Sequence, residues 1–277
     1  NRSKLAKLLR FYSSTNINEY ISLDDYVSNM TESQDKIYFI TGQNKHSLST
    51  SPFIEKLTSE GYNVLYFTEA IDEYMVQSLN EYEGKKLVDV SKEGIKFNEE
   101  ELKQKNENNK DLLKFIKDAL GETVQSVKIS DRLADTPCIL STAEHGWSAN
   151  MERILKAQAL RNSDMDQYMG AKKILEINLE HQLIKTLRIK MGLEDKMSDC
   201  INIVTLLYET ALINSGFTLE TPSLYAKRIN SMLESYFCDV DLEKYQATEN
   251  SEATEQCNLE ATENSEATEQ CNLEATE

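Results

Sequence analysis

IYFI (37–40), NVLYFT (63–68) and LVDV (87–90) are the segments that decide the fold of the first part of the chain. Each is a short apolar run of the kind that forms a buried strand. Between the first two, the sequence predicts a helix that begins at Pro52 and ends at Gly61, because proline is tolerated in a first turn and glycine favours a helix end. A second helix is predicted around Ile71, Tyr74, Met75 and Leu79. This alternation of strands and helices predicts a small parallel βαβαβ sheet.

Upstream of this unit, residues 1–31 are predicted to form two short helices. Ser22 and Asp25 have the spacing of a capping box, which favours the start of a helix at this point. In both segments the apolar residues recur at intervals of three and four, as one face of a helix requires. They are Leu5, Leu8, Leu9 and Tyr12 in the first segment, and Leu23, Tyr26, Val27 and Met30 in the second.

Residues 98–110 hold a single apolar residue, so they predict a linker or the start of a solvated helix, and we place a domain boundary there. In the second domain, an amphipathic helix over 111–120 is followed by Gly121, which favours its end. Strands are predicted at 127–130 (VKIS), 138–142 (CILST) and 174–177 (ILEI), with a long helix from Ser148. The second domain is therefore of mixed α/β class.

Two helices are predicted to close this domain, over 200–213 and 224–237. The first is apolar on nearly all sides, so it should be buried on nearly all sides. Together they could pack against a second copy as a four-helix bundle, or fold as a hairpin against their own chain. The apolar residues available for a dimer contact are Ile203, Leu206, Leu207, Leu212, Ile229, Met232 and Leu233.

The end of the chain, residues 241–277, is predicted to be a disordered acidic tail. The 14 residues ATENSEATEQCNLE (247–260) are repeated without change at 261–274, and no Lys or Arg follows Lys244. The whole chain has a formal net charge of −17 and no basic stripe, which disfavours nucleic-acid binding. Its apolar runs are shorter than the roughly 18 residues of a membrane span, so none is expected.

The stretch KISDRLADTPCILSTAEHGWSANMERILKAQAL (128–160) resembles the carboxy-terminal domain of the ninety-kilodalton heat-shock chaperones. LLYETALINSGFTLETP (206–222) is similar to the dimerisation helices of that family. Shorter segments match its middle domain in order: NRSKLAKLLRF (1–11), DKIYFITG (35–42), SPFIEKL (51–57), IDEYMVQSL (71–79) and SKEGIKF (91–97). The resemblance implies the end of a middle domain (1–97), a charged linker (98–110), a dimerisation domain (111–240) and the tail.

The resemblance also implies a function, which is dimerisation and the binding of partly folded client proteins. The ATPase domain of the family, with its ATP and Mg, would lie upstream of Asn1, so no cofactor and no enzymatic activity are expected of these residues. The sequence itself contains no phosphate-binding glycine motif. Co-chaperones are allowed as further partners. The alternative is a dimeric scaffold that displays the acidic tail without client contact.

The client-facing segment of the family resembles the sequence that begins at Gly146. The residues that the resemblance assigns to client contact are Trp147, Met151, Ile154 and Leu155. Exposed apolar side chains and adaptable methionines suit such a surface. From spacing alone, Trp147, Ile154 and Leu155 fit better as part of the core.

The five cysteines form no CxxC pair, and with three scattered histidines they give no metal-binding pattern. Cys138 lies in a predicted strand, where an inert buried thiol is the simplest interpretation. The resemblance adds a regulatory, redox-linked role for Cys138.

Parts of the sequence are similar to endoplasmin and others to cytosolic members, so we expect the lumen of the endoplasmic reticulum first, with the cytoplasm as the alternative.

Overall fold

The computed structural model describes residues 2–31, 34–95, 97–158, 173–193 and 197–237. The chain divides into two compact units, Asn1–Glu220 and Thr221–Glu277. The predicted acidic tail, residues 241–277, lies outside the described residues. No helix of the described residues is long and apolar enough to cross a membrane.

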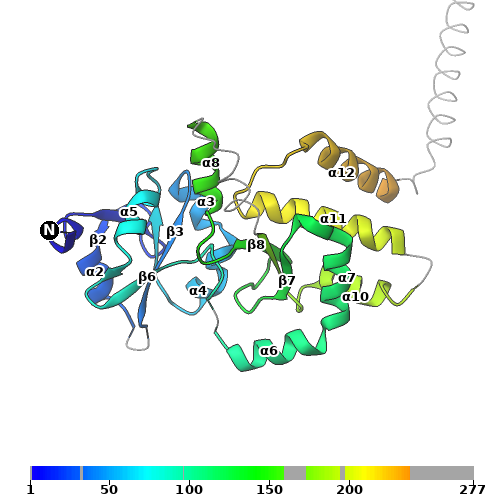
Figure 1. Cartoon of the computed structure of the whole chain (residues 1–277), viewed down its shortest axis with the longest axis horizontal. Coiled ribbons are helices and arrows are strands. Elements are labelled where there is room, and N and C mark those ends of the chain that lie inside the picture. Colours follow the sequence, from blue (N-terminus) through cyan, green and yellow to red (C-terminus); the bar gives the residue numbers. More distant parts are fainter. Residues whose placement is uncertain (1, 32–33, 96, 159–172, 194–196, 238–277) are drawn as a thin grey trace, which may run out of the picture. The chain divides into compact units, whose positions relative to one another are not determined.

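A six-stranded mixed sheet forms the first part of the larger unit (Figure 1). Its centre is the predicted parallel arrangement, with β3 lying between β4 and β6 and parallel to both. Antiparallel strands, which the sequence did not predict, extend it on both edges. The order is β2-β1-β4-β3-β6-β5, and the strands are β1 (Arg10–Ser13), β2 (Ile21–Ser22), β3 (Lys36–Thr41), β4 (Val64–Phe67), β5 (Glu81–Tyr82) and β6 (Lys85–Asp89).

The helices of this part are short, and their ends follow the local sequence signals. Ser22 and Asp25 form the predicted capping box, in which the Ser22 hydroxyl accepts from the Asp25 amide at 3.0 Å. Gly61 ends its helix with a φ of +84°, where a side chain would be strained. The helices are α1 (Arg2–Ala6), α2 (Leu23–Ser28), α3 (Lys45–Ser49), η1 (Pro52–Ile54), α4 (Glu55–Ser59) and α5 (Asp72–Ser78).

The helix predicted through Tyr12 is wrong beyond Ala6. Arg10–Ser13 is a strand because it completes the sheet edge: Tyr12 pairs with Tyr66, and Phe11 packs against Phe67 with ring centroids 4.3 Å apart. Phe11 and Ser13 are buried while their neighbours are more exposed, which is the period of a strand. Pairing with the neighbouring strands therefore decides the structure here, although Leu5, Leu8 and Leu9 have the spacing of a helix.

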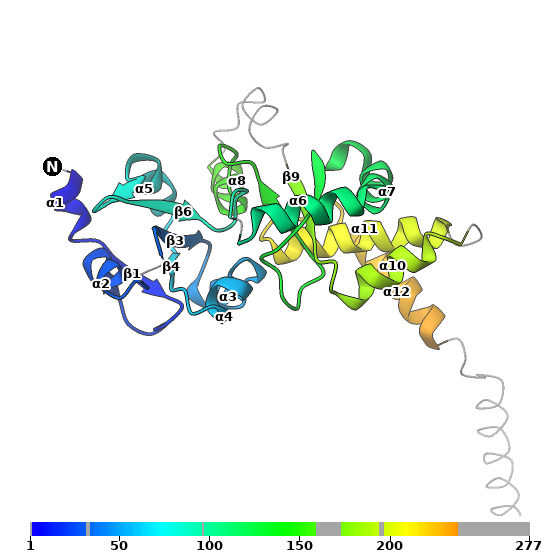
Figure 2. The ribbon, with the colours of Figure 1, turned by 90° about the horizontal axis from the view of Figure 1, so that it is seen from below.

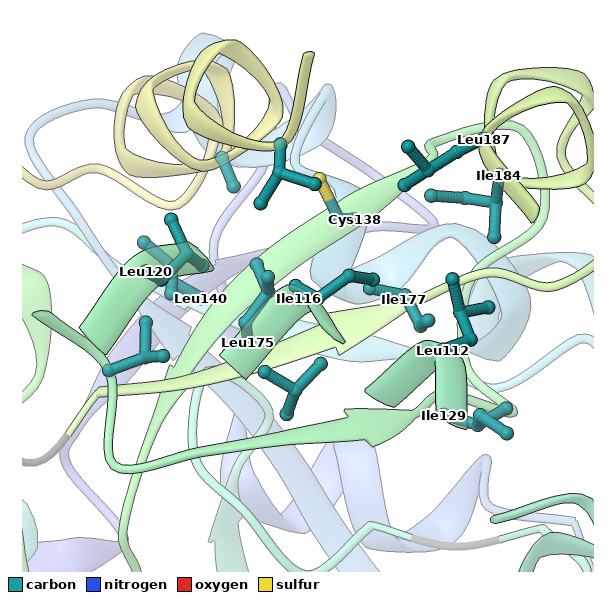
Figure 3. Close-up of a cluster of buried hydrophobic side chains, with 14 of the residues drawn as sticks. Leu112, Ile116, Leu120, Ile129, Cys138, Leu140, Leu175, Ile177, Ile184 and Leu187 are labelled. Atoms are coloured by element: carbon teal, nitrogen blue, oxygen red, sulfur yellow. The ribbon is translucent and has the colours of Figure 1, made fainter. Parts of the chain in front are cut away.

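A three-stranded sheet with the order β7-β9-β8 forms the second part of the larger unit. Strands β7 (Ser126–Ile129), β8 (Cys138–Thr142) and β9 (Lys173–Ile177) lie close to the predicted positions, with β9 parallel to β7 and antiparallel to β8. Helices α7 (Lys110–Leu120) and α11 (Met197–Asn214) pack on it, and Figure 3 shows the core between them, with Ile116, Cys138 and Leu175 among its members. Each such buried Leu or Ile contributes about 1.5–3 kcal/mol.

The charged segment 98–110 is largely helical, which confirms the solvated-helix alternative. Helix α6 (Glu99–Asn108) buries no side chain, and the Asn98 side chain caps it by accepting from the Glu101 amide at 3.2 Å. Figure 2 shows α6 beside α7 (residues 110–120). The domain boundary placed at 98–110 stays a prediction. One core cluster contains residues from both sides of it, with Phe53 and Leu57 from the first part and Leu133 and Ile139 from the second.

The two closing helices exist, but neither is buried on nearly all sides. Helix α11 buries Cys200, Val204 and Ala211 and leaves Ile201 and Ile213 more than 40% exposed. This corrects the expectation of burial all round: one side of α11 packs on β8 and α7, while Ile201 and Ile213 remain partly in solvent. The smaller unit contains α12 (Pro222–Phe237), which has no buried residue among those described.

Candidate functional site: the α8 segment and the closing helices

Helix α8 (Ala149–Ala157) begins at a buried carboxylate that comes from another element. Ser148 caps the helix, since its hydroxyl accepts from the Met151 amide at 3.0 Å. The same hydroxyl donates to Glu73 Oε1 at 2.6 Å, and Asn150 Nδ2 donates to that oxygen at 3.1 Å. Glu73 lies in α5 and is only 5% exposed. The start of α8 is therefore fixed to the first sheet's helices through one shared acceptor.

The four residues expected to contact clients divide into two kinds. Met151 and Ile154 are buried, while Trp147 and Leu155 are half-buried. Because Met151 and Ile154 are three residues apart, they lie on one face of α8, and that face points inward. Met151 and Ile154 therefore do not form the client-contact surface expected of them in this structure. Of the four residues, only Trp147 and Leu155 reach solvent.

Replacing Glu73 by alanine should loosen this arrangement. The variant leaves the buried Ser148 hydroxyl and Asn150 amide without their acceptor, which costs about 1–3 kcal/mol of unfolding free energy. The emission of Trp147, the single tryptophan, should move to longer wavelength as its surroundings open. Glu122→Ala removes an exposed glutamate of the same type and should change neither quantity. Unchanged emission and stability in Glu73→Ala would show that Glu73 does not position α8.

A buried arginine ties the second sheet to the first. Arg132 is 2% exposed, and its guanidinium donates to both carboxylate oxygens of Glu176 in β9, with an Nε–Oε2 distance of 2.8 Å. Its Nη1 donates to the carbonyl oxygens of Val90 at 2.7 Å and Lys92 at 3.0 Å, just beyond β6. Arg132 thus satisfies its donors on both sides, as a buried charge requires.

The carboxylate of Glu176 is held in its ionised form. Burial alone would raise its pKa, but the charge of Arg132 and hydrogen bonds from Arg132, Ser141 and Ser130 lower it below the usual range. The Ser141 hydroxyl donates at 2.6 Å and the Ser130 hydroxyl at 3.0 Å. The pair is therefore fully charged at neutral pH and completely hydrogen-bonded.

A second carboxylate joins the same two parts of the unit. Glu55, the first residue of α4, accepts from three successive backbone amides, those of Ala134 (2.9 Å), Asp135 (3.2 Å) and Thr136 (3.4 Å). The Thr136 hydroxyl donates to its other oxygen. Sequence reasoning treated 131–137 as a connection between strands and missed these contacts, because their partners lie some 80 residues upstream.

The residues expected at a dimer contact also divide. Ile203, Leu207 and Leu212 belong to the core of their own unit, as buried members or packed against it. On α12, Met232 is 53% and Leu233 48% exposed. Leu206 and Ile229 are half-buried. Further exposed apolar residues, absent from the expected set, are Met197, Ile201, Ile213, Leu224 and Phe237.

Cys138 is a buried thiol in the strand β8. It is 2% exposed, and its Sγ donates to the Leu207 carbonyl oxygen at 3.4 Å. Burial raises the pKa of the Cys138 thiol to about 12. A redox-sensing cysteine needs a low pKa and an accessible sulfur, and Cys138 has neither in this structure.

Cys138 should therefore be unreactive towards a thiol reagent at pH 8. With a pKa near 12, only about one thiolate in ten thousand is present at that pH. We expect native wild type and Cys138→Ala to show the same number of fast-reacting thiols with Ellman's reagent, and to differ by one thiol in denaturant. A fast native thiol that disappears in Cys138→Ala would restore the regulatory interpretation.

Comparison with known proteins identifies the family of this chain. A family model described as Hsp90 protein matches residues 1–269. The chain is 43% identical to an Endoplasmin homolog of Arabidopsis thaliana over 92% of the chain and 32% of that protein. It is 44% identical to Heat shock protein 83 of Leishmania donovani, over 84% of the chain and 53% of that protein. It spans about a third of the length of the Endoplasmin homologs that it matches. The chain belongs to the Hsp90 protein family.

Proposed function

We propose that these 277 residues form a dimerising, client-binding segment of an ATP-driven molecular chaperone. Membership of the Hsp90 family supports a chaperone role. The observation that carries the dimerisation proposal is the set of apolar side chains that α11 and α12 leave in solvent. Exposed apolar side chains of this size and number on closing helices favour a protein contact. They are Met197, Ile201, Ile213, Leu224, Met232, Leu233 and Phe237.

Client contact is proposed for the half-exposed part of the α8 segment. Trp147 and Leu155 offer an aromatic and an aliphatic side chain to solvent, while Met151 and Ile154 are buried. An aromatic residue with a polar N–H suits a surface that meets many partners. Clients of this kind are partly folded proteins with exposed apolar side chains.

Nucleotide chemistry is proposed to lie outside these residues. ATP and Mg would act in the family's ATPase domain, and the present residues would transmit its cycle to clients without catalysing a reaction. For the compartment, we keep the lumen of the endoplasmic reticulum first and the cytoplasm as the alternative, because Endoplasmin homologs and Heat shock protein 83 match with nearly equal identity.

Two measurements on the same sample test the proposal. The first is light scattering after size exclusion over a dilution series, on residues 1–246 and on all 277, where a dimer of both that persists to low micromolar concentration is expected. The second is suppression of aggregation of a heat-denatured client, which should saturate with added chain. Trp147→Ala should weaken suppression, and Lys114→Ala, an exposed residue of α7, should not.

The alternative function is a dimeric scaffold that displays the acidic tail. The burial of Met151 and Ile154 favours it, since it shrinks the surface available for clients. Dimers that do not suppress aggregation would support the scaffold. Monomers at every concentration would contradict both functions, because each of them requires a dimer.

A further inference from the structure

A pocket of about 470 Å³ lies within the larger unit, at the carboxyl end of β3. Its walls come from the segment 40–53, from the first turn of α8 and from the end of α11. The carboxyl ends of parallel strands are where open α/β sheets bind ligands, and the volume is that of a small-molecule site. Of its lining residues, Ile213 alone belongs to the sets proposed above for dimerisation or client contact.

The charge of the lining distinguishes this pocket from the rest of the surface. Among the residues that the structure describes, Arg153 of α8 is the single charged lining residue and no Asp or Glu lines the pocket, although the chain as a whole has a net charge of −17. The other polar lining groups are hydroxyls and amides. No carboxylate of the described residues forms an ion pair with Arg153, whose Nη2 donates only to the Asn150 side-chain oxygen, at 2.9 Å.

Two polar groups of the lining are buried without a hydrogen-bond partner. One is Nε of Arg153 and the other is Oγ1 of Thr41, a residue that is only 8% exposed. Buried polar atoms are satisfied in most native structures, so each unsatisfied one calls for an explanation. Both residues line the same pocket, and a guanidinium N–H and a hydroxyl are donors of the kind that bind a carboxylate.

We propose that this pocket binds a small monocarboxylate, whose anionic group pairs with Arg153 and whose apolar body contacts the aliphatic and aromatic lining. Leu48, Pro52 and Phe53 line the pocket and supply that apolar contact. One arginine balances one negative charge. A polyphosphate would bring several charges into a pocket with a single cation, in a protein that is already strongly acidic.

Fluorine NMR of 4-fluorobenzoate with the full 277-residue chain tests the proposal. The ligand signal should broaden in a saturable way, and the neutral 4-fluorobenzamide should bind at least tenfold more weakly. Arg153→Gln should weaken 4-fluorobenzoate binding at least tenfold, whereas Lys114→Gln, which removes the same charge from an exposed site of α7, should leave it unchanged. ATP and inorganic phosphate are added as competitors and should displace the ligand poorly.

A second variant keeps the test decisive if Arg153→Gln does not fold by circular dichroism. Asn214→Trp places a large side chain at an exposed lining position and leaves Arg153 intact, so it should block binding by volume alone. Three outcomes would each overturn the proposal. The first is equal binding of the acid and the amide, and the second is unchanged binding in Asn214→Trp or in folded Arg153→Gln. The third is tighter binding of ATP than of the carboxylate.

Discussion

Arg132→Met should lower the free energy of unfolding of the chain by about 3–5 kcal/mol. Methionine is an apolar side chain of similar length, but the variant leaves the buried carboxylate of Glu176 without its cation. It also removes the donors to the Val90 and Lys92 carbonyl oxygens. The measurement is urea unfolding followed by circular dichroism, with the midpoint compared at constant slope.

The double variant Arg132→Met, Glu176→Met distinguishes an unpaired charge from lost packing. Removing both partners eliminates the isolated carboxylate, so most of the lost stability should return. Lowering the pH gives an independent check on wild type. Because the folded-state pKa of Glu176 is lowered, its contribution is present above the pKa of an unfolded glutamate and is lost as pH falls through the folded value. A single variant as stable as wild type would show that the pair contributes nothing.

Those parts of the fold that depend on local signals were predictable from the sequence. The strands at β3, β4 and β6 are apolar runs, and the capping box at Ser22 and the helix end at Gly121 depend on residues a few positions apart. The failures are long-range. Leu8 and Leu9 have helical spacing, but the chain at Tyr12 and Ser13 is a strand because β4, more than 50 residues later, offers a pairing partner.

The α8 segment shows the same division. Its start at Ser148 was predicted from sequence, since a serine cap is a local feature. The inward orientation of Met151 and Ile154 was not, because a helix with apolar residues does not say which face another element will cover. The contacts of Arg132, Glu55 and Glu73 connect residues 40 to 81 positions apart. Each of the three has a charged neighbour in sequence (Asp131, Lys56 or Asp72), so no local pattern distinguishes them from surface charges.

Met232→Asp, Leu233→Asp should convert the proposed dimer into a monomer. Both side chains are about half exposed on α12, so the substitutions do not disturb a buried core of the chain itself. In a bundle of two copies, they would place four carboxylates in an apolar contact, where each unpaired charge is strongly unfavourable. The dissociation constant should rise at least a hundredfold, which is about 2.7 kcal/mol. Light scattering should then give 31.7 kDa instead of twice that mass at micromolar concentration.

Asn230→Asp, Ser235→Asp is the matched control, since it adds two negative charges to exposed polar positions of the same helix. Because these positions are not part of the apolar set, the control should remain a dimer, which separates lost apolar contact from added charge. If the Met232, Leu233 variant still has twice the chain mass, these residues are not in the interface. If wild type is itself monomeric and the variant only unfolds more easily, the helix closes on its own chain, and the exposed residues of α11 would have to serve another partner.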